Sequence, residues 1–219
     1  LSLMGSILWA IVMTRPDCAF HASYLCQFMA DPTIECWYAA IALLSYLYST
    51  RTLGILYKRC KSMCLSLYCD SSYGSVPKPT YGYIVFSNNA PIAWASKKQK
   101  IVPLSSCEAE TYALNAGCKS LMFIKNLLAE LNVTVELPMQ THTDNDAARL
   151  TTINPGTTAR TKHYEIWMRY CRELYLNLII EVNWVPTKEQ IADLLTKPLD
   201  KTTFLSLRAL LMTSNTEVP

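Results

Sequence analysis

Three β-rich runs stand close together between residues 65 and 96, and they limit the possible folds more than any other feature of the chain. The first run, LSLYCD, alternates Leu65, Leu67 and Cys69 with more polar residues, which is the two-residue period of a strand with one buried face. The second and third runs, YGYIVFS and APIAWAS, are separated by SNNAP, whose composition predicts a hairpin turn. The sequence therefore predicts three consecutive strands in one sheet.

Helical patterns and two further strand-like runs follow. We expect a long helix at 106–131, the strand PMQTHTD, a short helix at 146–151, a helix at 161–176, the strand LIIEVNWV, a helix after Pro186 and a helix in KTTFLSLRALLM. Strands first grouped and then alternating with helices indicate an α/β or α+β domain with a five-stranded sheet.

The first sixty residues are predicted to be helical and contain no strand-like run. They contain three helical stretches, which are LSLMGSILWAIVM, residues 17–30 and IECWYAAIALLSYLY. The third stretch is apolar on nearly every side, so it needs partners, and in isolation this segment is expected to self-associate. A basic link, YKRCKSMC, comes next. We therefore expect a helical segment at 1–60, the α/β domain at 61–200, and a C-terminal helix with a polar tail at 201–219.

Composition narrows the class of protein. With 51% hydrophobic and 17% charged residues, the chain can bury a core and is not disordered. The net charge of +3 permits a polyanionic partner without indicating one. Nine cysteines without a CxxC pair suggest reduced thiols in a cytosolic or nuclear protein, not a secreted one. The apolar N-terminal run is too short for a membrane span, and the lack of an initial Met suggests a piece of a polyprotein.

The stretch SSCEAETYAL places two glutamates two residues apart at the start of the long helix. Glu108 stands three residues after Ser105, the spacing of a capping box, so it has a structural role. Glu110 lies at the edge of the expected buried stripe, which runs through Ala109, Ala113, Ala116, Ser120, Ile124, Leu127 and Leu131. A carboxylate there costs free energy unless it is paired, although a partly solvated helix glutamate is the simpler interpretation.

Three aspartates stand near strand ends or in the helix after the last strand. Asp70 ends the first strand, Asp144 ends the fourth, and Asp193 follows the fifth. Each has a structural alternative: an Asx-turn for Asp70, a helix cap for Asp144 or Asn145, and an exposed charge for Asp193. Carboxylates that meet at one sheet edge would instead bind Mg²⁺, because hard oxygen ligands suit this ion.

The order of several motifs resembles one known family. CDSSYG, GYIVF, PIAWASKKQ, LSSCEAETYAL, TDNDAA, RTKHYEI and VPTKEQIADLLTKPL together resemble the ribonuclease H domain of copia-type LTR retrotransposon Pol polyproteins. The preceding GSILWAIVMTRPDCAFHASYLCQFMADP resembles the segment that joins reverse transcriptase to that domain. The resemblance covers almost the whole chain, which lacks a YxDD polymerase motif.

The resemblance implies a ribonuclease H-like sheet and an endonuclease that cuts the RNA strand of an RNA/DNA hybrid during reverse transcription. It implies that Asp70, Glu110, Asp144 and Asp193 hold two Mg²⁺ ions, with Mn²⁺ as a substitute. The reverse transcriptase portion of the same polyprotein is an implied partner.

Two groups of cations are candidates for holding the phosphates of the hybrid. Lys97, Lys98 and Lys100 precede the long helix, and Arg160 with Lys162 precedes a later helix. Solvated loops are the alternative. His163 is interpreted as a packed or capping residue.

Two departures from the family pattern leave a second hypothesis open. Relatives usually carry an acid after the first aspartate, where this chain has Ser71 and Ser72, and cellular ribonucleases H carry a histidine in the loop that here reads VPTKEQ. A decayed or repurposed fragment that folds, and binds nucleic acid without cutting it, is the alternative function.

Overall fold

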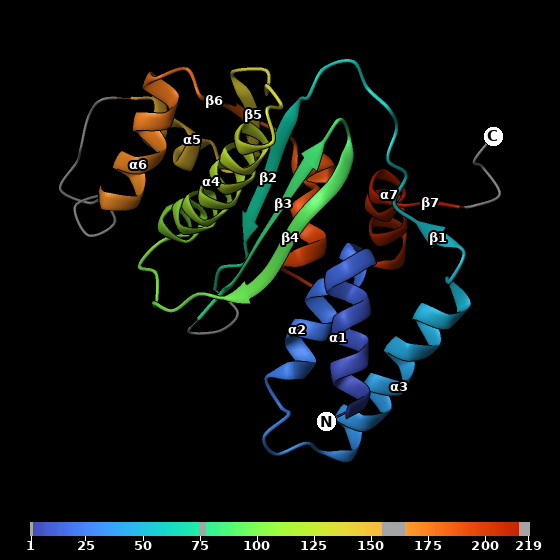
Figure 1. The fold of residues 1–219 in the computed structure, drawn as a ribbon. Coiled ribbons are helices and arrows are strands. Elements are labelled where there is room, and N and C mark those ends of the chain that lie inside the picture. The colour runs from blue at the N-terminus through green and yellow to red at the C-terminus, as the bar shows by residue number, and fades with distance from the viewer. Residues whose placement is uncertain (1, 75–77, 155–164, 215–219) are drawn as a thin grey trace.

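A five-stranded mixed sheet lies between two layers of helices (Figure 1). The computed structural model describes residues 2–74, 78–154 and 165–214. The strand order is β4-β3-β2-β5-β6, with β2 antiparallel to β3, β3 antiparallel to β4, and β2, β5 and β6 parallel. The strands are β2 (Leu65–Ser71), β3 (Thr80–Ser87), β4 (Ala90–Lys98), β5 (Met139–Thr143) and β6 (Ile180–Trp184). The expected α/β fold, with a five-stranded mixed sheet flanked by helices, is confirmed.

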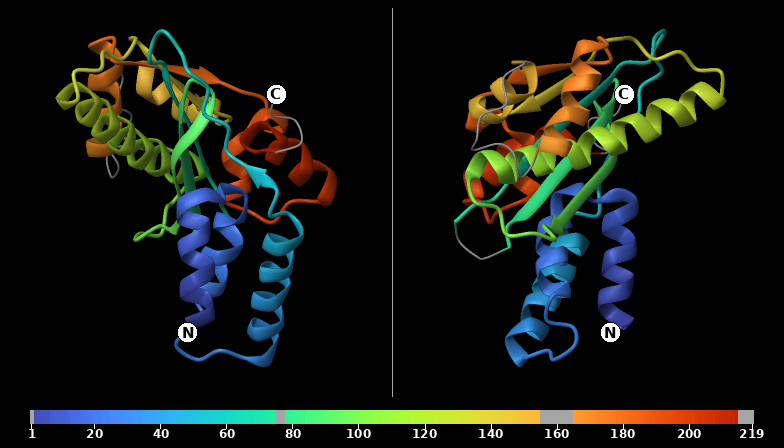
Figure 2. Two further views of the ribbon diagram at one scale, coloured as in Figure 1. Left: turned by 45° about the vertical axis from the view of Figure 1, so that its right-hand side comes forward. Right: turned by 90° about the vertical axis from the view of Figure 1, so that its left-hand side faces the viewer.

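The first helical layer consists of α4 (Ser106–Glu130), α5 (Asp146–Ile153) and α6 (Glu165–Leu176). Leu114, Cys118 and Leu121 of α4 pack with Leu67 and Val85 of the sheet in one hydrophobic cluster. The expected α4 stripe was wrong in its C-terminal half, because Leu127 and Leu131 are exposed. There α4 runs past the strands, so its apolar residues have no sheet beneath them (Figure 2).

The second layer combines the N-terminal helices with the C-terminal segment (Figure 2). It contains α1 (Ser2–Thr14), η1 (Pro16–Cys18), α2 (Ala19–Cys26), α3 (Ile34–Ser49), η4 (Ile191–Leu195) and α7 (Lys201–Leu211). Ile7 and Ile11 share one core cluster with Ile84, Leu194 and Leu207. Residues on both sides of the boundary expected near residue 60 therefore contribute to the same core.

Two expected helices have different forms. The stretch 17–30 begins as the 3₁₀ turn η1 and its α-helix ends at Cys26, since residues 27–30 form turns. After Pro186 the chain forms two 3₁₀ turns, η3 (Thr187–Glu189) and η4, in place of an α-helix. The buried Gln190 separates them: its amide donates to the Cys69 carbonyl at 3.0 Å, and its side-chain oxygen accepts from the Ala192 N–H. This contact ties the segment to β2 and interrupts a regular helix.

A buried ion pair anchors the second layer. Arg15 donates to both carboxylate oxygens of Asp17, at 2.9 and 2.8 Å, and to the Thr50 hydroxyl at 2.8 Å. The Tyr46 hydroxyl donates to Asp17 at 2.8 Å and accepts from Arg208 at 2.9 Å. Because Asp17 is fully buried, these partners provide the compensation that a buried charge requires.

A second, two-stranded sheet joins residues that are distant in sequence. β1 (Leu53–Gly54) pairs antiparallel with β7 (Thr213–Ser214), inside the stretch expected to be a polar tail. Two-residue strands carry no readable periodicity, so the sequence did not indicate this pairing. None of the helices within the described ranges is long and apolar enough to cross a membrane.

Candidate metal centre

Asp70 lies near the C-terminal end of β2 and is almost completely buried, with 2% of its surface exposed. The Thr196 hydroxyl donates to its Oδ2 atom. Burial raises the pKa of Asp70, and the Asp144 charge adds to this, while Lys197 and the Thr196 hydrogen bond oppose it. Asp70 is thus a carboxyl group whose charge is only partly compensated.

Asp144 follows β5, the strand next to β2. The Thr187 hydroxyl donates to its Oδ2 at 2.9 Å, and the Trp184 indole donates to its backbone carbonyl at 3.0 Å. Asn145, not Asp144, caps α5 through its side-chain oxygen. The capping alternative for Asp144 is therefore removed, and its carboxylate is oriented by η3.

The alternative interpretation of Asp193 as an exposed charge is wrong, since only 3% of its surface is accessible. That interpretation assumed an α-helix with one apolar side, whereas all five residues of η4 are buried. The Lys197 ammonium lies 2.8 Å from Asp193 Oδ1. Burial and the nearby Asp70 charge raise the pKa of Asp193 to about 7, although Lys197 opposes the shift.

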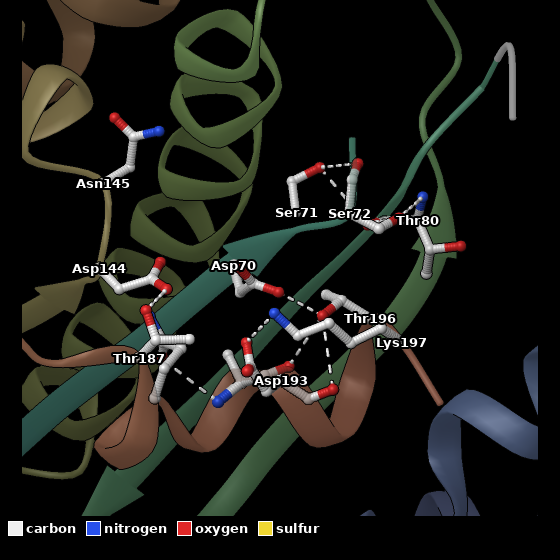
Figure 3. A network of polar contacts seen from close by, with 12 residues as sticks. Asp70, Ser71, Ser72, Thr80, Asp144, Asn145, Thr187, Asp193, Thr196 and Lys197 are labelled. Atoms are coloured by element: carbon white, nitrogen blue, oxygen red, sulfur yellow. Dashed lines mark hydrogen bonds and ion pairs between the residues drawn. The ribbon is translucent and has the colours of Figure 1, made fainter. Parts of the chain in front are cut away.

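These three aspartates converge from β2, the end of β5 and η4 (Figure 3). Each offers one oxygen, and the three oxygens lie within 4.8 Å of one another. They form the one such group of potential metal ligands in the part of the chain that the structure describes.

Glu110 approaches the same place from the first turns of α4. It is 6% exposed, and its Oε2 atom is buried without a hydrogen-bond partner among the described residues. Burial, Asp70 and Asp144 together raise the pKa of Glu110 well above its usual value. Glu110 therefore lies on the buried face of α4 and not at its edge, beside the aspartates.

Glu108 has the separate role that its spacing predicts. The Ser105 hydroxyl oxygen accepts from the Glu108 N–H at 3.1 Å, which is the first half of a capping box. The Glu108 carboxylate accepts from the Leu104 N–H at 2.6 Å, one residue before the cap. Glu108 is also buried, because it folds back over the helix N-terminus.

The four carboxyl groups fit divalent cations of the Mg²⁺ type. Their atoms are hard oxygens, and without a cation the negative charges would repel one another. The buried Oε2 atom of Glu110, which has no hydrogen-bond partner among the described residues, fits the role of a further oxygen ligand.

Sequence reasoning missed the residues that surround the acids. Thr196 and Lys197 follow Asp193 in IADLLTKPL, and the four-residue spacing from Asp193 to Lys197 was the available signal. Gln99 was also missed; its buried amide donates to Ser71 Oγ and to the Ala109 carbonyl, both at 2.9 Å. Gln99 therefore links the residue after Asp70, at the end of β2, to the residue before Glu110, at the start of α4.

The candidate phosphate-binding residues are only partly described. Lys97, Lys98 and Lys100 are exposed where β4 ends. Lys97 of β4 pairs with Tyr81 of β3, which pairs with Ser71 of β2. The lysines therefore lie at the same end of the sheet as Asp70, with the backbones of β4 and β2 about 10 Å apart at the usual strand spacing. Arg160, Lys162 and His163 lie outside the described residues.

The altered CDSSYG motif has a local structural role. The Ser72 hydroxyl donates to the Thr80 carbonyl at 3.3 Å and accepts from the Thr80 N–H at 3.0 Å. Ser71 accepts from Gln99. Both serines thus brace the β2–β3 connection beside Asp70.

Comparison with known proteins adds relatives along most of the chain. It is 35% identical over 205 residues to the retrovirus-related Pol polyprotein from transposon RE1 of Arabidopsis thaliana, and 32% identical over 206 residues to that from transposon TNT 1-94 of Nicotiana tabacum. The matches cover 92% and 93% of this chain, but only 14% and 15% of those proteins. The chain therefore corresponds to a small part of its relatives' length.

No family model matches the chain. Among solved structures, LC11-RNase H1 in complex with an RNA/DNA hybrid aligns with a TM-score of 0.47 at 13% identity, over 60% of this chain and 93% of that one. The family assignment rests on the sequence relatives and not on this likeness. By those relatives, the chain matches one segment of the copia-type retrovirus-related Pol polyproteins along nearly its whole length.

Proposed function

We propose that this chain is a ribonuclease H that holds two Mg²⁺ ions, or Mn²⁺ in their place, and cleaves the RNA strand of RNA/DNA hybrids during reverse transcription. The observation that carries the proposal is the convergence of Asp70, Asp144 and Asp193 beside the unpartnered oxygen of Glu110. Three acids from separate elements converge, and Glu110 from a fourth element lies near enough for Asp70 and Asp144 to raise its pKa. Each charge raises the folding cost of the others, and binding of cations would explain this arrangement.

Each acid has a role in this proposal. When bound, the cations would stabilise the charge that develops on the phosphodiester as water attacks it. Asp70 and Asp193 would supply ligands from the buried side, and Glu110 would supply one from α4. Asp144, which is less buried and is oriented by Thr187, would supply the most solvent-accessible ligand.

Asp144→Asn tests the proposal, with Asp146→Asn as its matched control. Asp146 is two residues away but is exposed and paired with Arg149 at 2.7 Å. Because metal assistance is worth several kcal/mol, Asp144→Asn should slow cleavage of a labelled hybrid in Mg²⁺ by about 100-fold or more. Asp146→Asn should leave the rate within about twofold.

Equal rates for the parent and Asp144→Asn would contradict the proposal. If the parent protein binds Mg²⁺ and the hybrid but does not cleave the RNA strand, the alternative hypothesis, a fragment that binds nucleic acid without catalysis, is supported instead.

We propose that Lys97, Lys98 and Lys100, together with Arg160 and Lys162, hold phosphates of the hybrid. The three lysines support this by their exposure and by their place at the sheet edge that carries Asp70. Such contacts position the duplex without reading its sequence.

Replacing Lys97 and Lys98 by Gln should weaken hybrid binding and reduce the slope of log K against log salt by up to about 2, since each lost phosphate contact removes about 0.9. Lys58→Gln with Lys61→Gln is the control, because these residues precede the opposite end of β2. The same slope in both double variants, measured by fluorescence anisotropy, would exclude the specific role of the β4 lysines.

We propose that the reverse transcriptase portion of the polyprotein covers the outer surface of the N-terminal helices. Large apolar side chains are exposed there, including Trp9, Val12 and Met13 on α1 and Trp37, Tyr38 and Tyr48 on α3. Exposed apolar patches commonly mark protein–protein interaction sites, and these side chains support such a site on the N-terminal helices.

A further inference from the structure

We propose that Lys197 is an internal cation of the acidic cluster, which holds Asp193 in place in the metal-free protein and must leave it when divalent cations bind. This inference rests on the proposed function, because it assumes that the acids are metal ligands. Lys197 is thereby a positioning residue that sets how tightly the chain holds its metal.

The geometry around Asp193 supports the first half of the proposal. Lys197 Nζ lies 2.8 Å from Asp193 Oδ1, and the Lys197 backbone N–H donates to the Asp193 carbonyl at 3.3 Å. The preceding residue, Thr196, donates its hydroxyl to Asp70. Two consecutive residues therefore hold two of the converging acids, and the Lys197 side chain reaches toward the space between them (Figure 3).

The charges explain why a cation stands at this place. Asp70, Asp193 and Asp144 all stabilise the charged form of Lys197, and its own charge stabilises the ionised forms of Asp70 and Asp193. One ammonium cannot neutralise four carboxylates, so the cluster keeps a strong attraction for further positive charge.

The burial of the two partners supports the second half. The Lys197 side chain is 36% exposed, whereas that of Asp193 is 4% exposed. The long, flexible side chain of Lys197 can move its ammonium into water, whereas the short, buried side chain of Asp193 cannot reach solvent. A divalent ion that takes Asp193 as a ligand would therefore displace Lys197, and breaking the ion pair would reduce the net affinity for the metal.

Calorimetric titration of Mg²⁺ into the full chain and into Lys197→Met tests this. Removing the competing ammonium should tighten Mg²⁺ binding by about tenfold, the size expected for one hydrogen bond to a charged group. Lys201→Met is the matched control, since Lys201 lies four residues further on, is exposed and lines the cavity between α2, α3 and α7. Lys197→Arg keeps the charge and should not tighten binding.

Thermal unfolding gives a second readout that does not depend on catalysis. In EDTA, Lys197→Met should unfold at a lower temperature than the parent, because the acids lose their counter-charge. Added Mg²⁺ should raise its melting temperature more than it raises that of the parent. If Lys197→Met does not fold, the ¹⁵N signal of the Lys197 ammonium in the parent should change from an ion-paired to a solvated position as Mg²⁺ is added.

The outcomes separate this inference from the proposed function. If the parent binds Mg²⁺ and Lys197→Met binds it with equal or lower affinity, the role of Lys197 alone is overturned. An ammonium signal that Mg²⁺ does not change has the same meaning. Absence of binding in both proteins overturns the proposed function, and the inference fails with it.

Discussion

At the scale of single residues, the candidate centre shows how burial changes the chemistry of an ordinary acid. Asp193 has a pKa of about 7 because it is buried and lies near Asp70. Its ionisation in the folded chain therefore occurs near neutral pH, whereas in the unfolded chain it occurs near the ordinary value of about 3.9.

This difference predicts a pH dependence of stability in the metal-free protein. Between about pH 4 and pH 7 the folded state binds more protons at Asp193 than the unfolded state does, so the free energy of unfolding should fall as pH rises through this window. Asp193→Asn, which cannot ionise, should flatten the slope of melting temperature against pH in EDTA. Identical slopes for the parent and the variant would show that Asp193 has an ordinary pKa.

Metal binding should depend on pH in the opposite direction. A carboxyl group must lose its proton before it becomes a ligand, so Mg²⁺ affinity should decrease as the pH falls below about 7.

At the scale of elements, the centre depends on how closely η4 approaches the sheet. Gly82 of β3 pairs with Asp70, and η4 lies directly over it. A Cβ atom at Gly82 would lie 2.5 Å from the Leu195 Cβ and 3.0 Å from the Thr196 Cγ2. The glycine is therefore what allows Asp193 to reach Asp70.

Gly82→Ala should force η4 away from the sheet, because a Cβ–Cβ clash cannot be relieved by rotating a side chain. We expect a loss of about 1–3 kcal/mol in the free energy of unfolding and a weaker Mg²⁺ affinity. Gly5→Ala in α1 is the control, since no atom lies within 4 Å of its new methyl group. Urea denaturation and calorimetry measure the two effects, and unchanged Mg²⁺ affinity in folded Gly82→Ala would rule out this dependence on close approach.

At the scale of the whole molecule, the five-stranded sheet separates two hydrophobic cores, one on each of its faces. The α4 side is closed by its own helices, whereas the other side is completed by α1, α2, α3 and α7. The network around Asp17 joins η1, α3 and α7, so the N-terminal helices and the C-terminal helix stabilise each other.

The exposed apolar face of α3 predicts association of the whole chain. Trp37→Gln with Tyr38→Gln should reduce self-association of the isolated chain, and should also weaken its binding to the reverse transcriptase portion of the polyprotein. Phe123→Gln is the control, because Phe123 is at least as exposed as Trp37 and Tyr38 but lies on α4 in the other layer. Sedimentation velocity measures both effects. A parent chain that stays monomeric at high concentration and does not bind the reverse transcriptase portion would refute the proposed interface.

The sequence by itself determined the five strands of the main sheet, most of the helices and their order; it did not indicate the two-residue strands β1 and β7 or the 3₁₀ turns η3 and η4. Alternation in LSLYCD and the capping spacing from Ser105 to Glu108 are local signals, since each depends on residues a few positions apart. They sufficed for the five-stranded sheet and, through the order of motifs, for the family. The same signals nominated Asp70, Glu110, Asp144 and Asp193 as candidates.

Only the tertiary structure decided the surroundings of those acids. Asp193 is buried because η4 is held against β2 by Gln190 and fits over Gly82, and no local pattern describes contacts between residues more than 100 positions apart. The same reason applies to Lys197, whose place beside Asp193 is local but whose effect on Asp70 and Asp144 is not. Long-range packing sets which charges meet and how far they are from water, and these two quantities govern what a carboxylate can bind.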